Sequence, residues 1–276
     1  MRIAITGAKG QLGTSLRNVL AGETLLLMDL PDHDITGVDV IPAIADFAPH
    51  VVIHAAAMTD VDGCELNPDA AFRVNALGTR NVALACQRCG AAMVYISTDY
   101  VFDGTKGEPY WEFDEPNPIS IYGQSKLAGE RTVQALLDRF YIVRTAWLYA
   151  RGGNNFVAKI LRLARERDEL AVVTNEVGSP TYAPDLARAI ARLIQHPLYG
   201  IYHLVNEGSC SRYEFARKIL DYAGLEDYAL RPLESYPRPA RPPAYAPLRN
   251  FVAATQLGIV LRPWEEALRA YFGEER

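Results

Sequence analysis

Short apolar runs alternate with segments of helical spacing through the first half of this chain, and that alternation limits the fold more than any other feature. The expected strands are residues 2–6, 24–29, 51–54, 92–97 and 140–144, and the helical segments between them are residues 11–20, 38–47, 69–86 and 121–137. Connections of this length join parallel strands, and helices then cover both faces of the sheet. We therefore predict an α/β fold with a doubly wound parallel sheet of the Rossmann type.

The pattern loosens after Thr145, where the expected elements are less regular. They are helices at 155–167, 184–195, 212–223 and 264–272 and a strand at 201–205. Ser211 and Glu214 are spaced as a capping box, which predicts the start of the third of these helices.

This change of pattern suggests two parts. We predict a dinucleotide-binding domain at 1–146 and a smaller, mainly C-terminal substrate-binding lobe at 147–276, with about 177–197 packing back on the first domain. The proline-rich residues 232–247 are too stiff for a helix or the interior of a sheet, so we expect a loop there. It is either a linker to the last helix or a flap over a ligand, and the pattern does not decide between them.

Charge and composition exclude several classes of protein. The formal charge is −5, and 28 Lys and Arg residues are scattered among 33 Asp and Glu, so there is no basic stripe and we expect no nucleic acid partner. No apolar run approaches the length of a membrane span, and the chain starts directly with a strand, so we expect neither a membrane partner nor a signal peptide. The four cysteines are few and dispersed, which favours a cytoplasmic protein. Cys86 and Cys89 form a C-x-x-C pattern without a second pair, which indicates buried thiols and no metal site.

A glycine-rich turn follows the first predicted strand and opens the first helix. Gly7 can make the tight turn, Gly10 lets the backbone approach a pyrophosphate, and Gly13 lets helix and strand pack closely. Asp29 ends the second strand, about 20 residues after Gly10, which is where dinucleotide-binding folds carry a carboxylate that binds a ribose 2′-hydroxyl. Asp29 could also be an ordinary turn residue at the end of a strand. Lys9 suits a 2′-phosphate and Asp29 repels one, so the pattern predicts a dinucleotide without choosing between NADH and NADPH.

Tyr122 and Lys126 lie four residues apart in the opening turn of a predicted helix, which brings both side chains to one face. A neighbouring cation is expected to lower the pKa of a phenol, so this pair suggests proton transfer; by itself it could also be an ordinary surface pair. Thr98 ends the fourth strand, at the edge where open parallel sheets bind their ligands. Its hydroxyl could hold a substrate oxygen beside the Tyr122 phenol.

These residues resemble the extended short-chain dehydrogenase/reductases that act on nucleotide-diphosphate sugars, and within them the dTDP-4-dehydrorhamnose reductase family. The resemblance runs from the first strand to about His203 and is weaker over the proline-rich loop and the final helix. Besides the glycine turn, Thr98 and the Tyr122-x-x-x-Lys126 pair, the segments that carry it are 97–102, 122–130, 144–149, 153–156, 178–181 and 202–204.

The resemblance implies a reductase that transfers hydride from NADH or NADPH to the C4 ketone of dTDP-4-dehydro-L-rhamnose, giving dTDP-L-rhamnose. This reaction belongs to nucleotide-sugar and cell-surface polysaccharide biosynthesis. Catalysis would be carried by Thr98, Tyr122 and Lys126. The residues implied to line the cofactor, together with Tyr122 and Lys126, are Gly7, Gly10, Gln11, Leu12, Asp29, Asp34, Ile35, Ala56 and Ala57. Those implied to face the sugar nucleotide, together with Thr98, are Thr59, Val61, Asp99, Tyr100, Trp147, Asn155 and, as a looser candidate for its phosphates, Arg241.

Some of these positions also have structural explanations. Trp147 could belong to the core, and Asn155 could cap the helix that follows it. Asn75 matches a water-holding asparagine of the wider superfamily, but a helical asparagine with a local hydrogen bond explains it nearly as well.

The chain departs from the family in two places. Some members form homodimers through Mg²⁺ bound by acidic side chains, and the matching positions here, Ser15 and Pro184, supply no carboxylate. A homodimer stays open, but a Mg²⁺-bridged one is doubtful. Ala246 and Arg249 replace a serine and an aspartate that many relatives carry in the proline-rich loop, which puts nucleotide contacts there in doubt.

Two other functions remain open. A nucleotide-sugar 4-epimerase or 4,6-dehydratase would use the same three residues with a retained NAD⁺, although dehydratases usually carry Glu where Tyr100 stands. A non-catalytic module similar to the regulatory subunit of methionine adenosyltransferase would share the fold without turnover.

Overall fold

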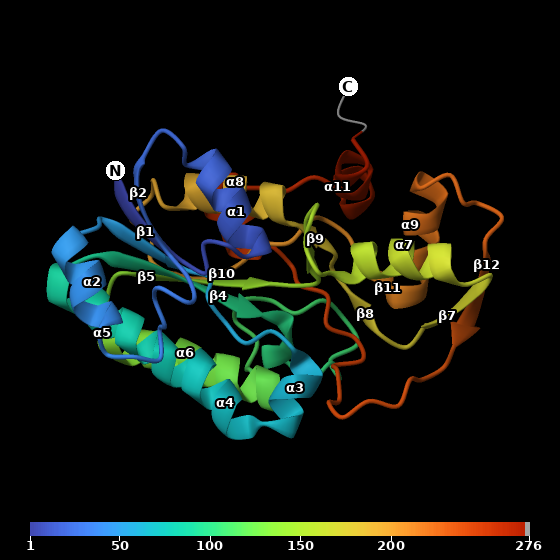
Figure 1. Cartoon of the computed structure of the whole chain (residues 1–276), viewed down its shortest axis with the longest axis horizontal. Coiled ribbons are helices and arrows are strands. Elements are labelled where there is room, and N and C mark those ends of the chain that lie inside the picture. Colours follow the sequence, from blue (N-terminus) through green and yellow to red (C-terminus); the bar gives the residue numbers. More distant parts are fainter. Residues whose placement is uncertain (274–276) are drawn as a thin grey trace.

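A six-stranded parallel sheet forms the centre of the molecule in the computed structural model, which describes residues 1–273 of the chain (Figure 1). The strands run in the order β10-β5-β4-β3-β1-β2, and every neighbouring pair is parallel. Their bounds are β1 Arg2–Thr6, β2 Thr24–Met28, β3 Val51–His54, β4 Ala92–Thr98, β5 Phe140–Thr145 and β10 Gly200–His203. The predicted doubly wound α/β fold is therefore confirmed.

Helices cover both faces of this sheet. One face carries α1 (Gln11–Val19), α8 (Ala183–Leu193) and α10 (Phe251–Leu257), and the other carries α2 (Val40–Phe47), α5 (Thr79–Cys89) and α6 (Ile121–Leu136). The alternation of β1 sets the two cores, because Ile3 and Ile5 are buried with α1 and α8 whereas Ala4 is buried with α2 and α5. Figure 1 shows α1 and α8 side by side.

The connection between β3 and β4 is more complex than the single helix predicted over 69–86. It contains α3 (Val61–Leu66), which the sequence did not indicate, then α4 (Pro68–Phe72), a π-helical turn at Arg73–Gly78 and α5. The π turn leaves Asn75 fully buried beside α6, a position that matters for the site.

A third hydrophobic core forms at the other end of the molecule from α7 (Phe156–Glu166), α9 (Arg212–Tyr222) and α11 (Trp264–Tyr271). The capping box of Ser211 and Glu214 is present and starts α9 as predicted. Three short strand pairs complete this part: β6 (Leu148–Tyr149) with β9 (Thr181–Tyr182), β7 (Glu169–Val173) with β12 (Ala229–Leu233), and β8 (Val177–Gly178) with β11 (Cys210–Ser211).

The proline-rich segment is not wholly a loop. Pro232 and Leu233 belong to β12, which within residues 1–273 pairs only with β7, so the expectation of a loop from residue 232 is wrong at its first two residues. A proline is tolerated there because β12 is an edge strand. The boundary between the two domains remains a prediction: α8 and β10 follow residue 146 in the chain, yet Leu186 and Tyr202 are buried in the same core as β1.

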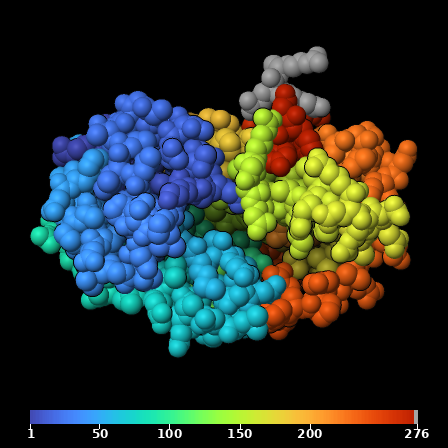
Figure 2. All heavy atoms as spheres, viewed as in Figure 1, coloured from blue at the N-terminus to red at the C-terminus, as the bar shows by residue number. Residues whose placement is uncertain are grey.

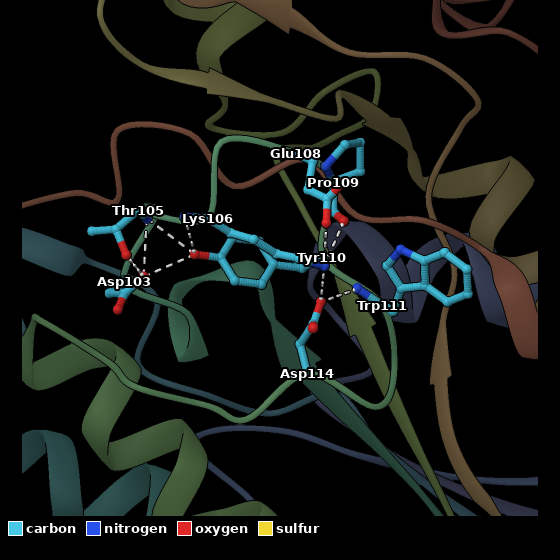
Figure 3. Close-up of polar contacts among 8 residues, drawn as sticks. All are labelled: Asp103, Thr105, Lys106, Glu108, Pro109, Tyr110, Trp111 and Asp114. Atoms are coloured by element: carbon cyan, nitrogen blue, oxygen red, sulfur yellow. Dashed lines mark hydrogen bonds and ion pairs between the residues drawn. The ribbon is translucent and has the colours of Figure 1, made fainter.

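The loop after β4 folds on itself through polar contacts (Figure 3). It follows the short helix η2 (Asp99–Val101). Asp103 Oδ1 accepts hydrogen bonds from the Thr105 backbone N–H at 2.9 Å and from the Tyr110 hydroxyl at 2.8 Å, and Lys106 Nζ lies 2.6 Å from Asp114 Oδ2. Burial would raise the pKa of Asp103, but the hydrogen bonds that it accepts from Asn117, Thr105 and Tyr110 outweigh this and hold the pKa well below its usual value.

None of the helices within residues 1–273 is long and apolar enough to cross a membrane. Within the same residues, no three His, Cys, Asp or Glu side chains are grouped as metal ligands would be. Cys86 is buried and Cys89 partly buried, both as free thiols.

Candidate active site

A cleft of about 780 Å³ opens at the carboxyl ends of the sheet strands. It lies where the strand order reverses between β1 and β3, which is where doubly wound sheets bind their ligands. The second part of the chain closes its far wall with Trp147, Leu148, Asn154 and Arg212. Figure 2 shows the surface hollowed between the blue N-terminal residues and the yellow-green segment.

The glycine-rich turn forms one end of this cleft. Gly7 has φ +71, and a Cβ there would lie 2.6 Å from the Ala56 backbone nitrogen. A Cβ on Gly13 would lie 2.1 Å from the Gly7 carbonyl oxygen, so helix α1 can pack this closely on the turn after β1 only with glycine. Gly10 is the N-cap of α1 and brings no capping side chain, which leaves the first N–H groups of the helix for an anion. The turn therefore fits a dinucleotide pyrophosphate.

Asp29 lines the cleft and also holds the turn. Its Oδ2 accepts a hydrogen bond from the Lys9 backbone N–H at 2.7 Å, and its Oδ1 accepts one from the Leu30 N–H at 2.8 Å. Lys9 Nζ donates to the Leu30 carbonyl at 2.7 Å. Asp29 thus combines the turn contact with a place on the cleft wall, where a cofactor ribose would be expected.

Thr98, Tyr122 and Lys126 meet on the middle wall of the cleft. The Ser120 hydroxyl accepts from the Gly123 N–H at 3.2 Å and so begins α6 just before Tyr122, while Thr98 ends β4. The Thr98 hydroxyl donates to Asp99 Oδ1 at 3.0 Å and accepts from the Tyr100 N–H at 3.2 Å. The Tyr100 ring packs edge-on against the Tyr122 ring, with the ring centres 5.4 Å apart.

Burial controls the ionisation of these groups. It raises the pKa of Tyr122 above its usual value, and a bond with Thr98 offsets only part of this rise. The net lowering of this phenol's pKa that the sequence suggested is therefore wrong for this structure, because burial outweighs the groups that favour the phenolate. Burial lowers the pKa of Lys126 to about 7, against the opposing attraction of Glu130. The Lys126 ammonium lies 4.3 Å from the centre of the Tyr95 ring.

A buried ion pair supports this wall from behind. Arg144 donates two hydrogen bonds to the Glu130 carboxylate, at 2.9 and 2.8 Å, and Ser97 donates to Glu130 Oε1 at 2.5 Å. Because Ser97 precedes Thr98 and Glu130 lies one turn after Lys126, the Ser97–Glu130 bond links the end of β4 to the helix that carries Tyr122, and Arg144 links β5 to the same helix.

Comparison with known proteins gives the family. The model described as "RmlD substrate binding domain" matches residues 1–276. The chain is 42% identical to a dTDP-4-dehydrorhamnose reductase of Mycobacterium tuberculosis, over 97% of this chain and 91% of the relative. The chain belongs to the dTDP-4-dehydrorhamnose reductase family. It is also 41% identical to the spore coat polysaccharide biosynthesis protein SpsK of Bacillus subtilis, over 99% of this chain and 97% of the relative.

A solved structure of this reductase family agrees closely with the fold. The dTDP-4-dehydrorhamnose reductase of Bacillus anthracis, determined in complex with NADP, superposes with a TM-score of 0.96 at 44% identity, and the match covers 99% of both chains.

Nearly all the residues implied by the family resemblance line the cleft. They are Gly7, Gly10, Gln11, Leu12, Asp29, Asp34, Ile35, Ala56, Ala57, Thr59, Val61, Thr98, Asp99, Tyr100, Tyr122, Lys126 and Trp147. Asn155 and Arg241 are not part of this wall. Asn155 caps α7 by accepting from the Ala158 N–H at 3.1 Å and donates to Gln11 Oε1 at 2.8 Å, and Arg241 is exposed.

Two residues have roles that sequence reasoning missed or left open. Arg212 lines the cleft, yet in the sequence it was only the first residue of the helix that the capping box opens. Asn75 makes long-range bonds instead of a local one: its Oδ1 accepts from the Met58 N–H at 2.9 Å, and its Nδ2 donates to Ser125 Oγ at 3.0 Å. No spacing along the sequence indicates either contact.

Proposed function

We propose that this protein reduces the C4 ketone of dTDP-4-dehydro-L-rhamnose with NADPH or NADH, giving dTDP-L-rhamnose. The observation that carries the proposal is that a hydroxyl, a phenol and an ammonium, those of Thr98, Tyr122 and Lys126, share one wall of a cleft that ends in a glycine cradle. Relatives named for this reaction at 39–42% identity, and a 44% identical structure in complex with NADP, support it.

The cradle fits the cofactor. The N-terminus of α1 would receive the pyrophosphate, and Asp29 would face the adenosine ribose beside Lys9. The rest of the cofactor would be lined by Asp34, Ile35, Ala56 and Ala57, together with Gly7, Gly10, Gln11 and Leu12 of the turn. A reduced nicotinamide held in the cleft would supply the hydride, and the protein would supply orientation and charge compensation.

Tyr122 is the proton donor in this proposal. Because burial keeps its pKa above the usual value, the phenol is protonated at neutral pH, and an alkoxide is a strong enough base to take that proton. The Lys126 ammonium would stabilise the phenolate that remains, and Thr98 would hold the reacting oxygen by a hydrogen bond. Thr59, Val61, Asp99, Tyr100 and Trp147 would position the sugar nucleotide.

The decisive experiment follows the nicotinamide absorbance during incubation with dTDP-4-dehydrorhamnose and NADPH or NADH. We expect net cofactor consumption by the wild-type protein, and Tyr122→Phe should lower kcat by roughly 10²–10⁴ while leaving cofactor affinity nearly intact. Tyr199→Phe, which removes a phenol outside the cleft wall, is the matched control.

Unchanged turnover by Tyr122→Phe would refute the proton-donor assignment. Product formation without net cofactor consumption, by protein that retains stoichiometric NAD⁺, would identify an epimerase or dehydratase instead. Binding of the sugar nucleotide without any reaction would identify a non-catalytic module.

A further inference from the structure

Trp147 is held in the cleft by an unusual set of contacts. Its φ of 45 is in the left-handed region, which non-glycine residues rarely adopt. Its indole lies directly on Gly178, where a Cβ would come within 2.5 Å of the ring. On the indole, the guanidinium carbon of Arg212 lies 3.5 Å from the ring centre, in stacking contact. Backbone conformation, a glycine and an arginine therefore fix this side chain at the cleft wall.

Arg212 itself is charged, largely buried and incompletely paired. Its side chain is 17% exposed, and its nearest carboxylate is Glu176, with 3.5 Å between Arg212 Nε and Glu176 Oε2. That is longer than the 2.7–2.9 Å typical of charge-assisted hydrogen bonds. Within residues 1–273, the guanidinium donates no hydrogen bond to another protein group. Its N–H donors are thus available to a ligand.

Glu176 is shared between two cations, so it neutralises Arg212 only in part. Arg238 Nη1 lies 3.8 Å from Glu176 Oε1. Asp99 also interacts with Arg212, but burial raises the pKa of its carboxyl to about 7, so it is only partly ionised at neutral pH. Because Glu176 is shared and Asp99 is only partly charged, the Arg212 guanidinium keeps positive charge that an anion can bind.

The position of Arg212 indicates which anion. Thr98 pairs with Thr145 across β4 and β5, so Trp147 lies just beyond the strand ends that carry the reacting groups. In a sugar nucleotide the diphosphate is attached to C1, which lies across the pyranose ring from C4. Arg212 lines the same cleft as Thr98 and Tyr122 and stacks on Trp147, so it is suitably placed for a diphosphate when C4 faces Tyr122 and Thr98.

We propose that Arg212 binds the diphosphate of the sugar nucleotide, while the Trp147 ring on which it stacks supports the sugar. This inference rests on the proposed function. It assigns the phosphate contact to Arg212 instead of Arg241, which is exposed and does not line the cleft. A guanidinium suits the role because its planar donors can bind two phosphate oxygens at once.

The test measures binding by titration calorimetry with the full-length protein, so it does not depend on turnover. Arg212→Gln should weaken the affinity for dTDP by roughly 10- to 100-fold and leave that for thymidine and NADPH within about twofold. Arg212→Lys keeps the charge but loses the planar fork, and we expect an intermediate loss. Lys218→Gln removes a positive charge from the same helix outside the cleft wall and should change none of the three affinities.

Three outcomes would overturn the inference. Equal weakening of dTDP and thymidine would mean that Arg212 acts only by supporting Trp147. A loss confined to NADPH would assign Arg212 to the cofactor, and a loss of dTDP affinity in Arg241→Gln but not in Arg212→Gln would restore the other arginine. Failure of the proposed function gives a different result, because wild-type protein would then bind dTDP without reducing the ketosugar.

Discussion

Lys126 combines a catalytic position with a cost in stability. Burial lowers the pKa of its ammonium from the usual 10.5 to about 7. Between pH 7 and 10.5, Lys126 is protonated in the unfolded chain but not in the folded chain, so the free energy of unfolding rises with pH over this range. Below about pH 7 the ammonium is charged in both states, and the buried charge then lowers the free energy of unfolding by its full amount.

At pH 6, Lys126→Met should therefore raise Tm by a few degrees and abolish reductase turnover, because methionine fills similar space without a buried charge. Thermal unfolding followed by circular dichroism at pH 6 and pH 9 measures this, and the gain should shrink at the higher pH. Lys159→Met, at an exposed position, should leave Tm nearly unchanged. An equal or lower Tm for Lys126→Met at pH 6 would show that contact with the Tyr95 ring compensates the charge.

Spacing along the chain was enough to select the reacting groups but not their ionisation. Tyr122 and Lys126 are four residues apart, so one helical turn brings them together wherever the helix packs. The pKa of Tyr122 depends on burial against Cys64, Ala71 and Tyr100, which come from other elements. Arg212 was missed for the same reason, since it reaches the cleft only after α9 packs beside Trp147.

At the scale of elements, the π-helical turn at Arg73–Gly78 positions Asn75 as a link between two walls of the cleft. Asn75 bonds to both backbone groups of Met58, at 2.9 and 3.1 Å, and to Ser125 on α6. Met58 immediately precedes the cleft residue Thr59, and Ser125 immediately precedes Lys126. Asn75 thus fixes the loop after β3 relative to the catalytic helix.

Asn75→Ala should lower the free energy of unfolding by about 2 kcal/mol or more, because it leaves the Met58 backbone groups without these partners. Urea denaturation measures the loss. Asn117→Ala removes an exposed bond to Asp103 and should cost much less. A change in stability no larger than that of Asn117→Ala would mean that water replaces the Asn75 amide without cost.

The elements that could be predicted are those whose signal is local. Apolar runs and helical spacing located all six strands of the main sheet, and the Ser211 and Glu214 spacing located the start of α9. The two-residue strands β6, β8, β9 and β11 have no periodicity of their own and exist only through tertiary pairing. The π turn is an irregularity in a segment whose spacing is otherwise helical, so the sequence indicated a single helix.

At the scale of the whole molecule, the proline-rich segment connects the two sides of the cleft. Asp62 on α3 accepts hydrogen bonds from Arg238 Nε at 3.0 Å and from the Ala240 N–H at 3.1 Å. Arg238 also lies near Glu176, which pairs with Arg212. The segment is therefore fastened to the first half of the chain beside the cleft residue Val61, which favours a flap over a simple linker.

Asp62→Ala should release this segment without unfolding the protein. Deuterium uptake of peptides covering 234–246 should become faster, whereas Tm should change little because the broken ion pair is partly exposed. Binding of dTDP should slow uptake in this segment of the wild-type protein, and less so in Asp62→Ala. Asp221→Ala breaks a comparable ion pair within α9 and should leave the segment unaffected. If deuterium uptake in 234–246 is the same in wild type and Asp62→Ala, with and without dTDP, the segment is a linker. A flap would exchange faster when its contact with Asp62 is lost and more slowly when its ligand binds.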